Sequence, residues 1–243
     1  MNNALEITGL TKRYPGFTLD HLSFSLPEGC IMGLIGENGA GKSTTLKMIL
    51  GLVRPTAGSI RVLGKSMDSK NRLAVLRQVG SLIESPSYYG HLTGEENLRI
   101  VQTLRGVPEK NIREVLQIVR LDGQRGKKVA HYSLGMKQRM GLALALLSQP
   151  ELMILDEPTN GLDIEATVEV REIILRLAKE KGVTFLVASH LASEIEKMCD
   201  KVLVLHEGEM LSFDTKEEAL RLHPSLEDYF LAKVRDKKGT VIL

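Results

Sequence analysis

The chain of 243 residues has two cysteines, no tryptophan and few aromatic side chains. Cys30 and Cys199 stand far apart and neither belongs to a Cys-x-x-Cys pair, so we expect no disulfide framework and no zinc site, and a reducing cytoplasm fits best. No apolar run approaches the roughly 20 residues that span a bilayer. The N-terminus lacks the basic and apolar regions of a signal peptide. We therefore expect any membrane role to depend on a partner.

The chain also lacks an excess of charge of one sign. It carries 32 Lys and Arg against 30 Asp and Glu, a formal net charge of +2, and the basic residues are scattered along the sequence. Nucleic-acid-binding domains usually concentrate basic residues on one face, so we expect no nucleic-acid partner. The length is sufficient for one large core, or for a core with a subdomain.

The most informative positive feature is a glycine-rich segment. Residues 36–43, Gly-Glu-Asn-Gly-Ala-Gly-Lys-Ser, match the phosphate-binding pattern Gly-x4-Gly-Lys-[Ser/Thr] at every specified position. An apolar segment at 30–35 precedes them and a helical pattern at 42–50 follows, so backbone N–H groups and a helix dipole would converge on one anion. Without this context the match would suit an accidental glycine turn. The segment therefore predicts a nucleoside triphosphate site.

Each residue type in this segment suits one part of a triphosphate with its magnesium ion. Glycines let the backbone approach closely, Lys42 can place its ammonium between the terminal phosphates, and the Ser43 hydroxyl can coordinate Mg²⁺. The residues that we assign to nucleotide binding here are Gly36, Glu37, Asn38, Gly39, Ala40, Gly41, Lys42, Ser43 and Thr44.

Strand and helix signals alternate at both ends of the chain. Helices are expected at 93–104, where Thr93-Gly94-Glu95-Glu96 resembles a capping box, at 109–119 and at 140–147. This order predicts an α/β fold with a mainly parallel sheet and a helical insertion between its halves. Strands are expected at 5–10, 19–26, 30–35, 59–63, 79–83, 152–155, 183–188 and 202–205.

Two acids follow the apolar strand at 152–155. Open α/β sheets bind ligands at the carboxyl ends of their strands. Asp156 is suited to hold Mg²⁺, and Glu157 can accept a proton from an attacking water. Alone, such a pair would more often be a strand ending in surface acids. The glycine-rich segment makes the functional interpretation stronger.

A third motif precedes these acids. Residues 132–139 read Tyr-Ser-Leu-Gly-Met-Lys-Gln-Arg, and an apolar helix follows. With these three motifs in this order, the chain resembles the ATPase subunit of ATP-binding cassette (ABC) transporters over roughly residues 4–215. The resemblance implies ATP as the nucleotide, a P-loop NTPase core with an antiparallel N-terminal β part, and a helical subdomain that carries the signature Ser133, Leu134, Gly135 and Met136.

The resemblance also assigns roles to single residues. It implies that Tyr14 stacks on adenine, that Asp163 belongs to the D-loop at 160–163, and that His190 is the switch histidine near the γ-phosphate. Glu157 would orient and deprotonate water. Two subunits, identical or related, would stack head to tail around two ATP molecules, so that the signature acts in trans. Closure on ATP would move membrane permease subunits, which implies a peripheral location on the inner face of the cell membrane.

Two departures from the common family pattern narrow the interpretation. The signature has Leu134 and Met136 where the family usually has Gly and Gln, and Glu84 stands where the family usually has Gln. Both features resemble the branch that serves lantibiotic immunity and bacitracin resistance. A carboxylate at position 84 would bind Mg²⁺ more strongly than an amide would, so we count Glu84 with Ser43 and Asp156 as metal ligands. We also count it with Glu157 and His190 among the catalytic residues. An exposed loop acid without a role is the alternative.

The sequence therefore predicts one ABC ATPase domain, with a catalytic core at 1–84 and 150–225, a helical subdomain at 85–149 and a C-terminal segment at 226–243 that we expect to be a solvated tail rather than a docking helix. The expected function is ATP hydrolysis for an exporter of a peptide antibiotic. An exporter with another cargo is the first alternative, and a soluble ABC ATPase acting on DNA or ribosomes is the second. A P-loop kinase or GTPase would leave the signature without a role, and Glu157 argues against a module that only binds ATP.

Overall fold

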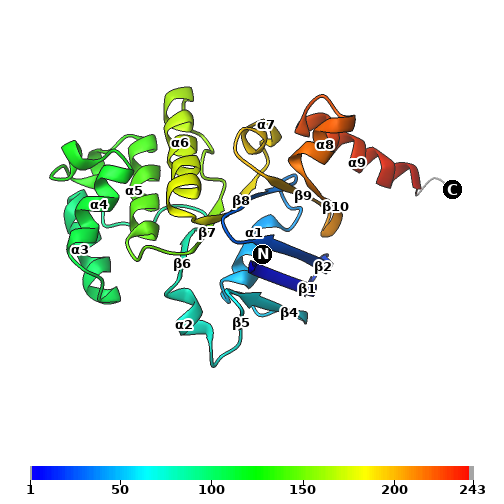
Figure 1. The fold of residues 1–243 in the computed structure, drawn as a ribbon, viewed down its shortest axis with the longest axis horizontal. Coiled ribbons are helices and arrows are strands. Elements are labelled where there is room, and N and C mark those ends of the chain that lie inside the picture. Colours follow the sequence, from blue (N-terminus) through cyan, green and yellow to red (C-terminus); the bar gives the residue numbers. More distant parts are fainter. Residues whose placement is uncertain (1, 241–243) are drawn as a thin grey trace.

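The computed structural model describes residues 2–240, which form two β-sheets and the helices around them (Figure 1). The N-terminal sheet is antiparallel, in strand order β2-β1-β4-β5. Leu22, Phe24 and Leu26 are buried at every second position of β2, as expected for a sheet with one face on the core. Its strands are β1 (Asn3–Tyr14), β2 (Phe17–Pro27), β4 (Ala57–Val62) and β5 (Lys65–Ser66).

The second sheet lies at the centre of the molecule and positions the site. Its strand order is β10-β9-β3-β8-β7-β6, with parallel pairing from β9 to β6 and antiparallel pairing of β10 with β9. Strands β3, β7 and β8 are buried at every position, because both faces of the sheet are covered. The strands are β3 (Ile31–Ile35), β6 (Val79–Leu82), β7 (Leu152–Asp156), β8 (Thr184–Ser189), β9 (Lys201–His206) and β10 (Glu209–Thr215).

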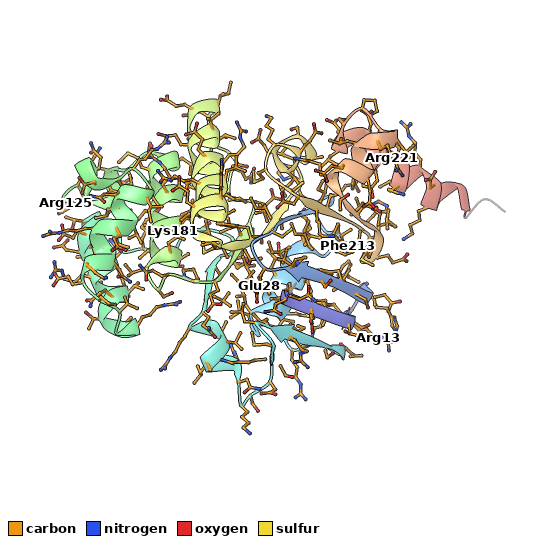
Figure 2. All side chains as sticks on the ribbon, viewed as in Figure 1. Arg13, Glu28, Arg125, Lys181, Phe213 and Arg221 are labelled. Atoms are coloured by element: carbon orange, nitrogen blue, oxygen red, sulfur yellow. The ribbon has the colours of Figure 1, made fainter. Side chains whose placement is uncertain are left out.

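Helices complete the layers on the two sides of the central sheet. Between β6 and β7 the chain forms a helical insertion, which lies at the left of Figure 1, while α8 and α9 lie at the upper right. Charged side chains such as Arg125 on the insertion and Arg221 on α8 are exposed (Figure 2). The helices are α1 (Lys42–Ile49), α2 (Arg72–Leu76), α3 (Gly94–Arg105), α4 (Lys110–Ile118), α5 (Leu134–Leu146), α6 (Ile164–Lys181), α7 (Ala192–Glu196), α8 (Lys216–Leu222) and α9 (Leu226–Thr240), with 3-10 turns at Asp122–Gln124 and Val129–His131.

Alternate residues of the central strands contribute to two hydrophobic cores. Phe185 and Val187 of β8 join a core made with the helical insertion and the helices that follow it, whereas Leu186 and Ala188 join a core made with α1 and the N-terminal sheet. This period of two is what a pleated strand imposes. The fold is the predicted α/β architecture with its helical insertion.

Local sequence signals explain the ends of several helices. The capping box expected at Thr93 is confirmed, because the Thr93 hydroxyl accepts a hydrogen bond from the Glu96 backbone N–H and the Glu96 carboxylate accepts one from the Thr93 N–H. Helix α5 begins at Leu134, before the expected range of 140–147. Ser133 caps it by accepting a hydrogen bond from the N–H of Met136.

The expected solvated tail at 226–243 is wrong for residues 226–240, which form α9. Leu226, Tyr229 and Val234 are buried. The Tyr229 hydroxyl donates to Asp214 and contacts Ser212 on β10. Burial of this apolar stripe outweighs the charge of the segment, and residues 241–243 lie outside the described residues. Within residues 2–240, no helix is both long and apolar enough to span a bilayer.

Candidate nucleotide-binding site

The glycine-rich loop connects β3 to α1 at the carboxyl edge of the central sheet. It lies against the end of β9, where a Cβ atom on Gly36 would clash with the backbone carbonyl oxygen of Leu205. Only glycine allows this approach. Lys42 is buried, and its ammonium donates hydrogen bonds to the carbonyl oxygens of Gly36 at 2.7 Å and Glu37 at 3.2 Å. The loop therefore curves around a positive charge.

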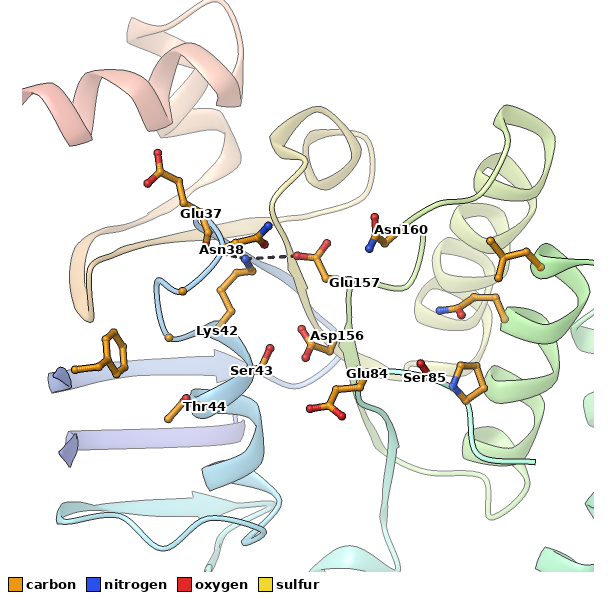
Figure 3. Close-up of a pocket in the computed structure, with 16 residues that line it drawn as sticks. Glu37, Asn38, Lys42, Ser43, Thr44, Glu84, Ser85, Asp156, Glu157 and Asn160 are labelled. Carbon is orange, nitrogen blue, oxygen red and sulfur yellow. Dashed lines mark hydrogen bonds and ion pairs between the residues drawn. The ribbon is translucent and has the colours of Figure 1, made fainter. Parts of the chain in front are cut away.

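Glu157 faces this lysine from the end of β7 (Figure 3). Its Oε1 lies 3.4 Å from Lys42 Nζ and accepts a hydrogen bond of 3.0 Å from the backbone N–H of His190. Its Oε2 accepts a hydrogen bond of 3.2 Å from the Ser189 hydroxyl and lies 2.8 Å from His190 Nδ1. Neighbouring parallel strands end at the same edge of a sheet, which brings Glu157, directly after β7, to Ser189 at the end of β8. Both oxygens of this carboxylate are held in place.

Asp156 has the properties of a metal ligand. Burial raises its pKa, and a hydrogen bond with Ser43 acts in the opposite direction. Its Oδ1 is buried and makes no hydrogen bond within residues 2–240. A buried carboxylate oxygen with unused lone pairs, beside a serine hydroxyl, fits a hard divalent cation such as Mg²⁺. The residues present therefore suit the magnesium ion that the sequence predicts.

Glu84 enters the same cavity but contacts a residue that the sequence analysis did not single out. Its Oε1 lies 2.6 Å from Nζ of Lys47, one helical turn after Ser43 on α1. The Glu84 side chain is 67% exposed. The hydrogen bond from Lys47 lowers the pKa of Glu84, so this carboxylate is ionised at neutral pH. Glu84, the predicted metal ligand, is thus already paired with the Lys47 ammonium.

The cavity around these groups has a volume of about 580 Å³. It brings together residues of the glycine-rich loop, the strand ends and the N-terminal part of α5, which contributes Leu134 and Gln138. Phe17 and Gln138 were not predicted, although Phe17 lies only three residues after Tyr14. The predicted residues that line the cavity are Glu37, Asn38, Gly39, Gly41, Lys42, Ser43, Thr44, Glu84, Leu134, Asp156 and Glu157.

Other predicted residues lie outside the lining of this cavity. Ser133 caps α5, and Asp163 caps α6 by accepting a hydrogen bond of 2.8 Å from the Ala166 N–H. Gly135 lies where α5 meets α6, since a Cβ atom there would come within 2.6 Å of the Ala166 Cβ atom. The Tyr14 ring is partly exposed, with Lys12 Nζ 5.1 Å from its centroid. Signature and D-loop residues therefore have structural roles within one chain.

The glycine-rich loop between β3 and α1 encloses Lys42, and two acids at the end of β7, the next strand but one, lie opposite it. This arrangement defines a P-loop nucleotide-binding protein. The family model described as "ABC transporter" matches residues 19–160. The chain belongs to the ABC transporter ATPase family. It is accordingly an ATPase coupled to transmembrane transport.

Two curated relatives cover most of the chain. The bacitracin transport ATP-binding protein BcrA of Bacillus licheniformis is 47% identical over 213 residues, which are 87% of this chain and 69% of the relative. The lantibiotic transport ATP-binding protein SrtF of Streptococcus pyogenes is 41% identical over 208 residues, 85% of this chain and 89% of the relative.

Solved structures with the same fold include an ATP-binding subunit of an ABC transporter, which is 32% identical with a TM-score of 0.83 and covers 95% of this chain and 99% of its own. The cbiO1 protein of Clostridium perfringens, part of the transporter complex cbiONQ, has the same TM-score at 25% identity and covers 91% of this chain and 92% of its own. These similarities confirm the predicted fold class.

Proposed function

We propose that this chain is the ATP-hydrolysing subunit of an exporter that protects cells from a bacitracin-like or lantibiotic peptide antibiotic. The observation that carries the proposal is the 47% identity with the bacitracin transport protein over 87% of the chain. The relative named for lantibiotic transport supports the same class of cargo. The chain would act as one ABC ATPase domain, with its core at 1–84 and 150–225 and its helical subdomain at 85–149, peripheral to the inner face of the membrane on permease subunits.

The geometry supports distinct roles for the residues around Lys42. Lys42 would turn from the loop carbonyl oxygens to the terminal phosphates of ATP, while Ser43 and Asp156, with Glu84 as a further candidate, would hold Mg²⁺. The ion, when bound, would offset the negative charge of the phosphates. Glu157 would take the proton of the attacking water on a carboxylate oxygen. The hydrogen bonds from His190 and Ser189 fix the direction in which that carboxylate points.

Exposed apolar side chains support the pairing of two ATPase subunits. Leu134, in the signature, begins α5, and Ile164, next to the D-loop, begins α6. Leu191 follows the switch histidine and directly precedes α7. All three are exposed, Ile164 to 87%. Large apolar side chains gathered around a binding site commonly mark a protein interface. In a head-to-tail dimer, the N-terminus of α5 with Ser133 and Gly135 would meet the γ-phosphate bound by the other subunit.

Resistance of a sensitive host tests the proposed cargo. The chain is expressed together with its candidate permease, and the inhibitory concentrations of bacitracin and of a nisin-type lantibiotic are measured. We expect the parental pair to raise at least one of them and the Glu157→Gln pair to raise neither. Unchanged sensitivity to both peptides, with the permease in the membrane and ATP hydrolysed, would favour an exporter with another cargo.

A further inference from the structure

His206 is a buried histidine beside the phosphate loop that the functions above do not use. It is the last residue of β9 and is 2% exposed. Neither ring nitrogen makes a hydrogen bond to any part of the chain between residues 2 and 240. The nearest carboxylate oxygens are Oε2 of Glu37, 3.7 Å from Nδ1, and Oε2 of Glu207, 3.9 Å from Nε2. Buried polar groups normally have partners, so an imidazole between two acids points to a function.

The segment that carries His206 is joined to the phosphate loop at both ends. Val204 pairs with Ile35, the last residue of β3 before the loop, and Leu205 packs against Gly36. After the turn, the N–H of Gly208 donates a hydrogen bond of 3.0 Å to the carbonyl oxygen of Ala40. Movement of the His206 ring or of its charge would therefore act directly on the loop.

Glu37 poses an electrostatic problem for nucleotide binding. It lies in the loop that binds a polyanion and is one of the residues that line the cavity, its side chain is 64% exposed, and its backbone carbonyl oxygen accepts a hydrogen bond from Lys42. A free carboxylate at this place would repel the phosphates, and the repulsion between charges a few ångströms apart is substantial even when water screens it.

We infer that His206 is a positioning residue of the phosphate loop, whose protonated ring attracts the Glu37 carboxylate, neutralises it and holds it away from the bound phosphates. Glu207 supports the same imidazolium from the other ring nitrogen. The inference rests on ATP binding by the family site and is independent of the cargo. It makes nucleotide affinity depend on the protonation of one histidine.

The charges on the neighbouring elements leave these two acids as the partners of His206. On β10, Glu209 pairs in register with His206, but its carboxylate contacts Lys237 of α9 at 2.9 Å. On β2, the carboxylate of Asp20 contacts the ring of His21 at 2.7 Å. The first turn of α1 places Lys42 next to Glu157.

The direction of the pH dependence follows from the charges. Histidine is the side chain that ordinarily gains its charge as the pH falls from about 8 to 5. The imidazolium neutralises Glu37, so affinity for the nucleotide should be highest at the acid end of this range. Loss of the proton leaves Glu37 uncompensated and should weaken binding by about threefold to tenfold, as expected for one water-screened charge near the ligand.

The test is the dissociation constant of ADP, measured by calorimetry on the full chain between pH 6 and 8.5. ADP itself titrates in this range, so each variant is compared at each pH with His21→Gln, which removes a histidine that is 75% exposed and lies outside the cavity. His21→Gln should retain the parental pH dependence. In His206→Gln, the increase in ADP affinity at low pH should be smaller than in the His21→Gln control, because the part that His206 contributes is lost.

Glu37→Gln provides the second arm. It removes the charge that His206 neutralises, so affinity should stay near its low-pH value throughout, and adding His206→Gln should weaken binding no further. The inference would be overturned if the ADP affinity of His206→Gln depended on pH as steeply as that of the His21→Gln control. Additive effects of the two substitutions on ADP affinity in the double variant would also overturn it. If His206→Gln does not fold, the Glu37→Gln variant is sufficient: the parental dependence of ADP affinity on pH in that variant would overturn the inference. Resistance is not measured here, so an error about the cargo cannot produce these outcomes.

Discussion

Glu157 is the residue whose environment most resembles that of a working base. One of its oxygens receives the backbone N–H of His190 and the other receives the Ser189 hydroxyl, so its orientation is set before any substrate arrives. Lys42 Nζ lies 3.4 Å from Oε1 of Glu157.

The first prediction follows from that arrangement. Glu157→Gln should lower the ATP turnover rate by about 10² to 10⁴, because a glutamine cannot accept the proton. The affinity for ATP should remain, since the contacts of the glycine-rich loop are unchanged. Steady-state hydrolysis and equilibrium binding are measured on the variant and on Glu180→Gln, an exposed control on α6. Turnover near the parental rate in Glu157→Gln would assign the base to another residue.

The Lys47–Glu84 pair gives the second prediction. The Lys47 ammonium now holds the carboxylate that we expect to assist Mg²⁺ binding, so the ion must compete with it. Lys47→Met should lower the Mg²⁺ concentration that half-saturates nucleotide binding and ATPase activity, while Glu84→Gln should raise it. Lys179→Met, on the exposed side of α6, is the control. One common Mg²⁺ dependence for all the variants would leave Glu84 as a loop acid paired with a lysine.

Among the elements, α5 and α6 approach each other closely because residue 135 has no side chain. A methyl group on Gly135 would lie 2.6 Å from the Cβ atom of Ala166. The signature glycine therefore has a packing role in a single chain, besides the role in trans that the family resemblance implies.

The third prediction concerns this contact. Gly135→Ala should lower the free energy of unfolding by about 1–3 kcal/mol, the usual cost of overpacking. Gly239→Ala on α9 is the matched control, because no heavy atom lies within 4 Å of the added methyl group, and it should be neutral or slightly stabilising. Urea denaturation measures both. Equal stability of the two variants would show that α5 and α6 separate at little cost.

The fourth prediction concerns the attachment of α9 to β10. Tyr229→Phe removes the hydroxyl that bonds to Ser212 and Asp214 and should destabilise the fold by about 1 kcal/mol. Tyr89→Phe, at an exposed ring, should have no measurable effect on the thermal unfolding temperature. If the two phenylalanine variants unfold at the same temperature, the hydroxyl of Tyr229 contributes nothing to stability.

The elements that sequence reasoning predicted are those with strong local signals. Strands β3, β7 and β8 are continuous apolar runs because both faces are buried, and the capping box at Thr93 is visible in four residues. Strand β10 was missed because its apolar residues Met210, Leu211 and Phe213 are interspersed with polar ones and none of its seven residues is fully buried. In α9 the charges of Lys233 and Arg235 hid an apolar stripe, although the spacing of Leu226, Tyr229 and Phe230 carries the helical period.

In the candidate site too, the residues that could be predicted are those in local sequence motifs. The glycine-rich loop and the acids after β7 are contiguous motifs, so their residue types identify them, although their roles in hydrolysis stay predictions. The partners Lys47 and His206 could not be identified from the sequence. Lys47 meets Glu84 only because the loop after β6 approaches α1, and His206 meets Glu37 only because β9 lies beside β3.

At the scale of the whole molecule, we propose that each complete catalytic site needs residues of two chains. The glycine-rich loop and Glu157 lie in the cavity, whereas Ser133 caps α5 outside the cavity lining. Large apolar residues are exposed at the N-terminal ends of α5 and α6, among them Leu134 and Ile164. Two copies arranged head to tail would cover these residues and complete two sites.

The measurement that tests this account most directly is ATP turnover in a mixture of two inactive variants. Lys42→Ala disables the loop and Ser133→Ala disables the signature, so either protein alone should hydrolyse little ATP. Ser133→Ala also removes a helix cap worth about 1 kcal/mol, so its folding is verified by thermal unfolding. Mixing the two should restore part of the parental turnover, because each mixed dimer contains one intact site. Mixed dimers that form and remain inactive would contradict a site shared between two chains.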